Sequence, residues 1–177
     1  MIVRVNSWGE MPRQWFEGLV NIYIECFSEP PWNERWENNI VAKEFKKNIS
    51  FENNISLIWL EENLPMGATM NYPIVFKEDV RVFVPKKEWQ GTMYLAETFV
   101  DPRRRRQGIA KNLHGHRLEI ARESGFTQVV QRTSGNSKMF PLIEKTGFKK
   151  LAIQQTWSEK EEGGVRPDER VISIRSL

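Results

Sequence analysis

The sequence is poor in cysteine and histidine, and each shortage excludes a kind of chemistry. Its 177 residues include one cysteine, Cys26, and two histidines. A single cysteine excludes an intrachain disulfide and is typical of a reducing compartment, where free cysteine is commonly buried as a small apolar residue. His114 and His116 stand two positions apart in a predicted helix and so point to different faces. We therefore expect both histidines at the surface and no metal site.

Long apolar runs and a large excess of one charge are also absent. No apolar stretch approaches the ~20 residues that a membrane-spanning helix needs. The start, MIVRVNSWGE, lacks the basic-then-apolar order of a signal peptide. The formal net charge is only +3 at pH 7, so basicity is local rather than spread over a face. These features predict a cytoplasmic protein that binds neither a membrane nor nucleic acid.

The chain length and the spacing of apolar residues predict one mixed α/β domain over residues 1–177. The stretch DVRVFV, residues 79–84, alternates like a strand, whereas the PKKEWQG that follows is typical of a loop, so the extent of a strand here stays open. The other expected elements follow in chain order: a strand at 1–5, helices at 12–27 and 36–45, a hairpin turning near 62–65, a strand at 92–100, a helix after Gly108 that ends at 124–125, a strand at 127–133, a short helix at 137–146, and an antiparallel pair at 148–157 and 170–176.

Four consecutive arginines, Arg103 to Arg106, stand between the strand that ends at Val100 and the helix that follows Gly108. The first backbone N–H groups of a helix have no partner inside the helix, and its dipole adds positive charge there, so this turn favours an anion such as phosphate. Gly108 lacks a Cβ and lets phosphate oxygens approach the backbone. A solvated basic loop is the alternative, and the GxxxxGK[ST] pattern of a P-loop is absent.

The segment from Arg105 to Ala110 resembles the acetyl-CoA motif of the GNAT N-acetyltransferase superfamily, Arg/Gln-x-x-Gly-x-Gly/Ala. Asn136 and the later Glu144–Phe148 are similar to that family's second motif, an asparagine followed by a short helix ending in Gly-Phe. The resemblance implies a GNAT-like fold, with a central, mostly antiparallel mixed sheet flanked by helices. It also implies transfer of acetyl from acetyl-CoA to a primary amine within a ternary complex.

The resemblance further implies where acetyl-CoA binds. Backbone amides between Arg105 and Ala110 would hold the pyrophosphate, the pantetheine arm would lie beside the end of the strand, and Asn136 would contact its pantetheine side. The expected cofactor-binding residues are Phe99, Val100, Arg105, Arg106, Gln107, Gly108, Ile109, Ala110, Lys111 and Asn136. Dimers formed through an edge strand or the C-terminus are common in this family, so a homodimer and a monomer both stay open.

Glu97 is the expected catalytic residue. A primary amine is mostly protonated at pH 7 and must lose a proton before it attacks a thioester. Glu97 lies on the strand next to the expected thioester, where relatives carry a carboxylate, and would act as the base directly or through water. Binding of a cationic acceptor is the alternative role. A backbone N–H near Phe99 or Val100 would stabilise the oxyanion.

The sequence departs from the family at the usual general acid, a tyrosine seven residues after the asparagine. That position is Ile143, so Tyr94, Ser137 or water would have to protonate the leaving thiolate. Pro141 would break a helix running from Asn136 unless the helix begins close to it. A non-catalytic acyl-CoA-binding domain is therefore the competing hypothesis.

The acceptor itself is not identified by the sequence. Trp32 and Trp36 lie between the two early helices, where this family builds its acceptor wall, although core packing is the simpler reading for any one tryptophan. Glu29, Glu34 and Glu37 lie nearby in the sequence and would favour a cationic acceptor.

Overall fold

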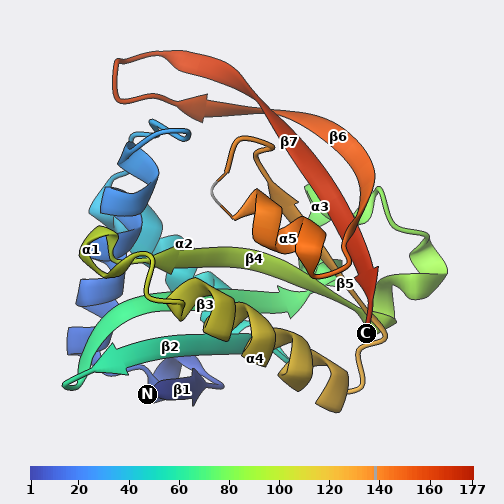
Figure 1. Ribbon diagram of the computed structural model, residues 1–177, viewed down its shortest axis with the longest axis horizontal. Coiled ribbons are helices and arrows are strands. Elements are labelled where there is room, and N and C mark those ends of the chain that lie inside the picture. Colours follow the sequence, from blue (N-terminus) through green and yellow to red (C-terminus); the bar gives the residue numbers. More distant parts are fainter. Residues whose placement is uncertain (138) are drawn as a thin grey trace.

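A single sheet of seven strands organises the computed structural model, which describes residues 1–137 and 139–177 (Figure 1). The strand order is β1-β2-β3-β4-β5-β7-β6, and every neighbouring pair is antiparallel except β4 and β5. The strands are β1 (Ile2–Val5), β2 (Ile55–Glu61), β3 (Leu64–Pro73), β4 (Thr92–Val100), β5 (Gln128–Thr133), β6 (Lys149–Glu159) and β7 (Val165–Ser176). The predicted mixed, mostly antiparallel sheet is confirmed.

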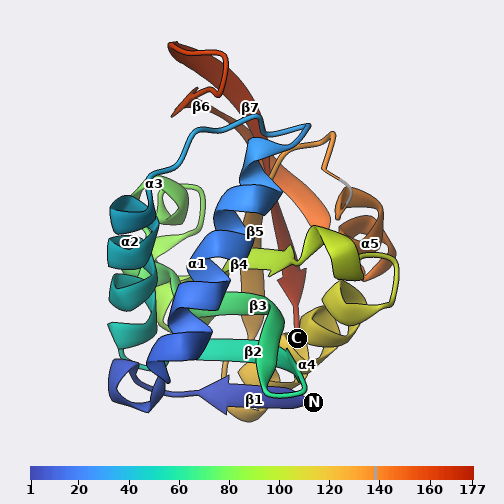
Figure 2. The same cartoon turned by 90° about the vertical axis from the view of Figure 1, so that its left-hand side faces the viewer.

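Helices cover both faces of this sheet (Figures 1 and 2). On one face, α1 (Arg13–Ser28) packs on β3 and β4, and α2 (Asn38–Ser50) packs on α1 and β3. On the other face, α4 (Ile109–Glu123) packs on β2, β3 and β4. The shorter helices are α3 (Glu78–Arg81) and α5 (Phe140–Lys145). Within the residues described, none of the helices is long and apolar enough to cross a membrane.

Apolar spacing and local stop signals explain the long helices. In α1 the buried side chains recur at three- and four-residue steps, and the helix ends just before Pro30 and Pro31, which cannot continue it. In α4 the left-handed Gly125 (φ 86°) ends the helix, and the N–H of Phe126 donates to the carbonyl of Ala121 over 3.1 Å. This is the capping pattern expected of a glycine just past a helix C-terminus.

A β-bulge in β4 decides which face Glu97 occupies. Met70 of β3 pairs with Glu97, whereas the next residue, Asn71, pairs with Leu95, so Ala96 is the extra residue in β4. Before the bulge, Leu95 packs in the core cluster beneath α4; after it, Phe99 packs in the cluster beneath α1 and α2. The bulge therefore moves Glu97, two residues from Phe99, to the face of α1 and α2.

Strands β4 and β5 separate after a short paired section. They pair only from Thr92–Leu95 to Gln128–Gln131, and the rest of β5 pairs with β7 alone. The second half of β4, residues 96–100, therefore has β3 on one side and an opening on the other. This opening connects the two faces of the sheet.

Four sequence-based expectations differ in detail from the structure. Residues 79–84 lie in the short helix α3 and the turn after it instead of in a strand. Val80 and Val84 are four residues apart and both buried, as on one face of a helix, while Val82 between them is 69% exposed. Residues Lys86–Gly91 form a 3-10 helix where a loop was expected. The helix expected at 137–146 is shorter, since Pro141 fits only its first turn. Strand β7 also begins earlier than expected, at Val165.

His114 is buried, which contradicts the expected surface position, whereas His116 is exposed. The Nδ1 atom of His114 lies 2.7 Å from NH2 of Arg117, a buried arginine on the same helix. Burial, followed by the charge of Arg117, lowers the pKa of His114 to about 3, so its ring is neutral. Arg117 also donates to Thr98 of β4 over 2.7 Å and thereby joins α4 to the separated part of that strand.

Candidate active site

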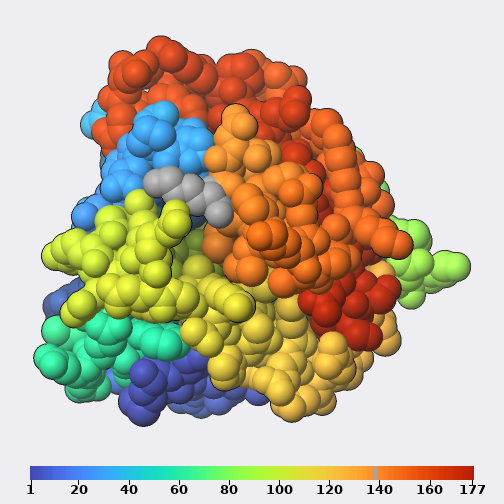
Figure 3. All heavy atoms as spheres, viewed as in Figure 1, coloured from blue at the N-terminus to red at the C-terminus, as the bar shows by residue number. Residues whose placement is uncertain are grey.

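A cavity of about 1230 Å³ lies at the opening between β4 and β5. Its lining comes from both faces of the sheet: from the segment before α4 and from α5 on one side, and from α1, α2 and the segment between them on the other. In Figure 3, the segment after β4 (yellow) and α5 (orange) lie beside one another at the surface in view. Two ligands that approach from opposite faces can therefore meet in this opening.

The N-terminus of α4 opens into one half of the cavity. The first hydrogen bond of the helix runs from the N–H of Asn112 to the carbonyl of Gly108 over 2.9 Å, so the N–H groups of Gly108–Lys111 precede the intrahelical ladder. Gly108 is left-handed, with φ 82° and ψ 0°, and no side chain caps the helix. These donors and the helix dipole form a site suited to a phosphate group.

The four arginines differ in their partners. Arg103 pairs with Asp101 at 2.8 Å, Arg104 pairs with Glu61 at 3.2 Å, and Arg105 pairs with Glu29. Arg106 is exposed and has a left-handed backbone with φ 65°. Because three of the four are already balanced by carboxylates, the stretch is a folded turn rather than a uniformly free basic patch.

The expected cofactor-binding residues mostly meet at the cavity. The lining includes Phe99, Val100, Arg105, Arg106, Gly108, Ile109, Ala110 and Lys111. Gln107 and Asn136 are exposed and do not belong to the lining. Ser137, the residue after Asn136, is buried and does line it.

Gln131 belongs to the site but was missed by the sequence analysis. It occupies the last β4–β5 rung, opposite Leu95, and it lines the cavity with only 3% of its surface exposed. Among the described residues, its Nε2 is the one buried side-chain nitrogen or oxygen without a hydrogen-bond partner. A buried amide donor without an acceptor is costly, and an amide carbonyl of a bound molecule would supply one. The signal that could have identified Gln131 in the sequence is a polar residue at a position of a predicted apolar strand that faces the core.

Glu97 lines the cavity on the face of α1 and α2, and its side chain is partly exposed there. Burial raises the pKa of Glu97 to about 7; the charge of Glu34 raises it further, and the charges of Lys77, Arg132 and Arg170 lower it. A carboxyl group with this pKa is present in both protonation states near neutral pH. The group can therefore accept a proton from a neighbouring molecule and return it to solvent.

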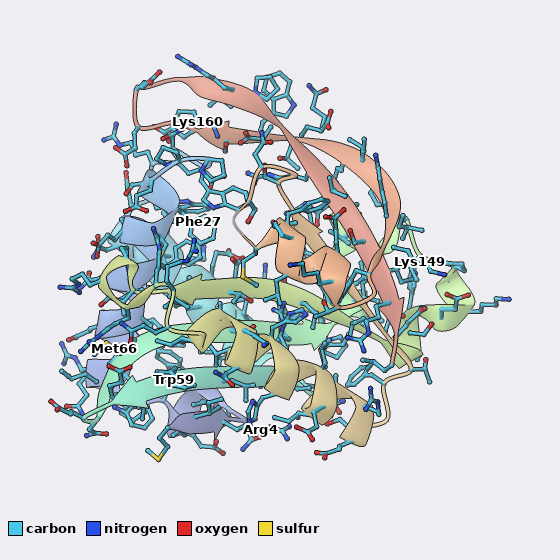
Figure 4. All side chains as sticks on the ribbon, viewed as in Figure 1. Arg4, Phe27, Trp59, Met66, Lys149 and Lys160 are labelled. Atoms are coloured by element: carbon cyan, nitrogen blue, oxygen red, sulfur yellow. The ribbon has the colours of Figure 1, made fainter. Side chains whose placement is uncertain are left out.

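A network of charged residues joins the segment 32–36 to the β6–β7 hairpin at the wall of the cavity. Arg170 of β7 donates to Glu34 over 2.6 Å and lies 4.4 Å from the centre of the Trp32 ring. Lys160, at the tip of the β6–β7 hairpin, donates to the carbonyl of Trp32 over 2.7 Å and to Asp168 over 2.6 Å. Figure 4 shows this hairpin above the end of α1, where Phe27 is labelled. We call residues 32–36 and this hairpin the roof of the site.

The position of the usual acid holds an apolar residue. Ile143 of α5 is buried and lines the cavity. Tyr94 lies on the opposite face, packed on Tyr72 with ring centres 5.6 Å apart. Burial raises the pKa of Tyr94 to about 12, so this hydroxyl is a weak proton donor to a thiolate.

The chain matches the model of the acetyltransferase (GNAT) family over residues 16–148. The match covers more than half of the chain, and the protein belongs to this family. The seven-stranded sheet and its helices are the GNAT fold. Family and fold together support acyl transfer from acetyl-CoA. No curated protein matches the chain by sequence.

Solved structures of similar fold have distant sequences. A ribosomal-protein-alanine N-acetyltransferase from Brucella melitensis is 16% identical, with a TM-score of 0.71 over 100% of this chain and 99% of that chain. An N-acetyltransferase from Staphylococcus aureus Mu50 is 15% identical, with a TM-score of 0.70 over 99% and 97%. A phosphinothricin acetyltransferase from Sinorhizobium meliloti, in complex with AcCoA, is 15% identical, with a TM-score of 0.71 over 100% and 88%.

Acetyl-CoA is the co-substrate that the family supports, and the donors at the N-terminus of α4 and the orphan amide of Gln131 fit it. In the part of the chain that the structure describes, no group of three or more His, Cys, Asp or Glu side chains is placed to hold a metal ion.

Proposed function

We propose that this protein is an N-acetyltransferase that transfers the acetyl group of acetyl-CoA to a primary amine by direct attack in a ternary complex. The observation that carries this proposal is Glu97, a carboxyl group with a pKa of about 7 that faces the cavity where β4 leaves β5. About half of such groups are ionised at neutral pH, so Glu97 can take a proton from a protonated amine.

The proposed reaction needs no further protein nucleophile. Glu97 accepts the amine proton, directly or through one water, and the amine nitrogen then bonds to the thioester carbonyl carbon. The carbon–sulfur bond then breaks and the CoA thiolate leaves. The second proton, which the attacking nitrogen loses as the amide forms, passes to the thiolate through water, so the products are the N-acetyl amide and the free CoA thiol. Water suffices because a thiol is acidic enough to leave as its anion, which makes the isoleucine at position 143 compatible with turnover.

The oxyanion donor is the backbone of β4 beside the opening. The carbonyl of Val100 accepts a hydrogen bond from the thiol of Cys26 over 3.1 Å, and the N–H of the next residue, Asp101, donates to Met66 at the start of β3 over 2.8 Å. Alternate residues of a strand direct their backbone N–H and C=O groups to opposite neighbouring strands. Because Asp101 bonds to β3, the N–H and C=O groups of Val100 point away from β3. Its N–H is therefore placed to donate into the opening.

The cofactor assignments follow from the same geometry. The N–H groups of Gly108–Lys111 would hold the pyrophosphate, and Phe99 and Val100 would border the pantetheine arm. Ser137 would take the place expected for Asn136, because Ser137 lines the cavity and Asn136 does not.

The test is release of free CoA from acetyl-CoA in the presence of a panel of primary amines, with the acetylated amine identified by mass spectrometry. Amine-dependent release with formation of an N-acetyl product supports the proposal. Tight acetyl-CoA binding with no release above the background for any amine would instead support a non-catalytic acyl-CoA-binding domain.

Gln131→Leu should change stability and cofactor binding in opposite directions. The substitution removes a buried donor that has no partner, so the free protein should melt at a higher temperature. CoA affinity should fall by about 10-fold, because the bound cofactor loses one hydrogen bond. Thermal unfolding and calorimetric titration with CoA measure the two effects.

Gln128→Leu on the same strand is the matched control. The Nε2 of Gln128 already donates to Thr92 over 2.7 Å and to Glu88 over 3.0 Å. Its replacement should lower stability and leave CoA affinity unchanged. Unchanged CoA affinity in Gln131→Leu would refute the assignment of Gln131 to the cofactor.

A further inference from the structure

The acids expected to attract a cationic acceptor are not all free to do so. Glu34 is occupied by Arg170 at 2.6 Å and by the indole N–H of Trp36 at 3.0 Å. Glu29 pairs with Arg105, one of the four arginines before α4. Glu37 lines the cavity but is exposed. The roof is therefore largely neutralised and does not by itself select a cation.

The opposite wall of the same half-cavity has more positive than negative charge. Lys77 and Arg132 line the cavity, and both pair with one carboxylate, Asp79, at 3.0 Å and 2.5 Å. Although burial raises the pKa of Asp79, the charges of Arg132 and Lys77 keep it below its ordinary value, so Asp79 stays ionised. Two cations that share one anion leave a net positive charge.

Both cations line the same cavity as Glu97. Their charges also lower the pKa of Glu97, against the effect of burial. Arg132 also donates through NH1 to Gln154 of β6 over 3.0 Å, and both of its recorded hydrogen bonds use NH1. Among the described residues, NH2 and Nε of Arg132 have no hydrogen-bond acceptor, so they can donate to a ligand in the cavity that Arg132 lines.

The space between these charges and the roof is aromatic. Tyr72 and Tyr94 line the cavity beside the two cations, and Trp32 and Trp36 line it from the roof. Trp32 packs on Phe27 with ring centres 5.3 Å apart. A ligand that bridges Glu97 and the cation pair would therefore place its remaining atoms against aromatic side chains.

The geometry points to an amphoteric acceptor: a small molecule whose primary amine faces Glu97 and whose carboxylate binds Lys77 and Arg132, with an apolar body against the aromatic wall. An α-amino acid with an apolar side chain has this chemistry. The inference rests on the proposed N-acetyltransferase function and names its acceptor class. Arginine and lysine in a partly enclosed site bind a carboxylate through charge-assisted hydrogen bonds.

The test compares the apolar L-amino acids with the amines that have the same side chain but lack the carboxylate. Calorimetric titration into the CoA-loaded protein measures binding, and product formation from acetyl-CoA measures kcat/KM. We expect each amino acid to bind at least about 10-fold more tightly than its matching amine, since the carboxylate makes charge-assisted bonds that the amine lacks.

Variants of Lys77 and Asp79 test whether this charged group binds the ligand or only stabilises the fold. Measured well above pH 7, where Glu97 is ionised with or without the charge of Lys77, Lys77→Met should weaken amino-acid binding by about 10-fold and leave binding of the matching amine unaffected. Lys87→Met removes an equally charged but exposed lysine outside the cavity lining, and should change neither. Asp79→Asn should strengthen amino-acid binding, because it removes the anion that competes for both cations.

The outcomes distinguish the two proposals. Carboxylate-dependent binding that Lys77→Met abolishes supports the acceptor class even if turnover is absent, in which case the proposed reaction fails alone. Equal binding of amines and amino acids overturns the acceptor class, even if amines are acetylated. If Lys77→Met weakens binding of the amines and the amino acids equally and also lowers the melting temperature, the ion pairs of Lys77 and Arg132 with Asp79 only stabilise the fold, and the acceptor class is overturned.

Discussion

Gly108→Val is expected to weaken acetyl-CoA binding by at least about 100-fold. Gly108 has φ 82°, a conformation that a β-branched residue adopts only at high cost. The turn must rearrange, and the N–H groups at the start of α4 then lose their common direction toward a phosphate. Calorimetric titration with CoA measures the affinity, and circular dichroism checks that the variant remains folded.

Gly163→Val supplies the matched control for backbone strain. Gly163 also has a left-handed backbone, with φ 87°, but lies in the β6–β7 turn outside the cavity lining. Both variants should be less stable than the wild type, and only Gly108→Val should lose CoA affinity. A folded Gly108→Val protein with wild-type CoA affinity would remove the basis for placing the pyrophosphate at α4.

Glu97→Gln is expected to lower turnover by about 100-fold or more, with acetyl-CoA binding nearly unchanged. The amide keeps the shape of the carboxylate but cannot accept the amine proton. In the wild type, kcat/KM should rise with pH through about 7, where Glu97 ionises. The variant should lack this limb and should recover part of its activity at higher pH, where more of the acceptor amine is already neutral.

The same substitution should stabilise the protein above neutral pH. Glu97 has a pKa of about 7 in the folded protein and 4.5 as its ordinary value, so the folded state holds the proton more tightly than the unfolded state. Folding stability therefore decreases as pH rises from about 4.5 to about 7 and stays reduced above that range. Glu97→Gln removes this penalty, so its advantage in melting temperature should be large at about pH 8 and vanish near pH 4.5.

Glu52→Gln, at an exposed position outside the cavity lining, is the control for a lost surface charge. It should leave both the pH–rate profile and the melting temperature close to those of the wild type. If Glu97 only binds a cationic acceptor, Glu97→Gln should raise KM and leave kcat intact. Wild-type kcat in this variant at neutral pH would exclude Glu97 as the base.

The half of the site around α4 could be predicted because it is encoded in consecutive residues. The strand Thr92–Val100, the turn and the helix that begins at Ile109 all appear where the sequence places them. Strand-forming residues, Pro102 and Gly108 act locally, so the phosphate-sized site follows from a short segment. Gln107 and Asn136 are the exceptions, because both are exposed and outside the cavity lining, where Ser137 lies in place of Asn136.

The acceptor half could not be predicted because its parts are distant in the sequence. Lys77, Arg132 and Arg170 come from three different elements, and only the folded sheet brings them near Glu97. The face that Glu97 occupies depends on the bulge at Ala96, which breaks the two-residue period of the strand. A sequence pattern that alternates without interruption gives no sign of this extra residue.

The burial of His114 and the exposure of Val82 could not be predicted from the sequence either. The sequence offers no way to see that Arg117 and Thr146 would give His114 polar partners inside the protein. Val82 continues an apparent alternation, yet the chain turns into a helix and leaves it 69% exposed. In both cases tertiary contacts decide an outcome that local propensity leaves open.

The roof and the cofactor turn belong to different parts of the chain. The family match ends at Phe148, whereas Lys160, Asp168 and Arg170 lie beyond it in the terminal hairpin. Changes in this hairpin can therefore alter the proposed acceptor half of the cavity while the turn at Gly108 and the start of α4 stay as they are.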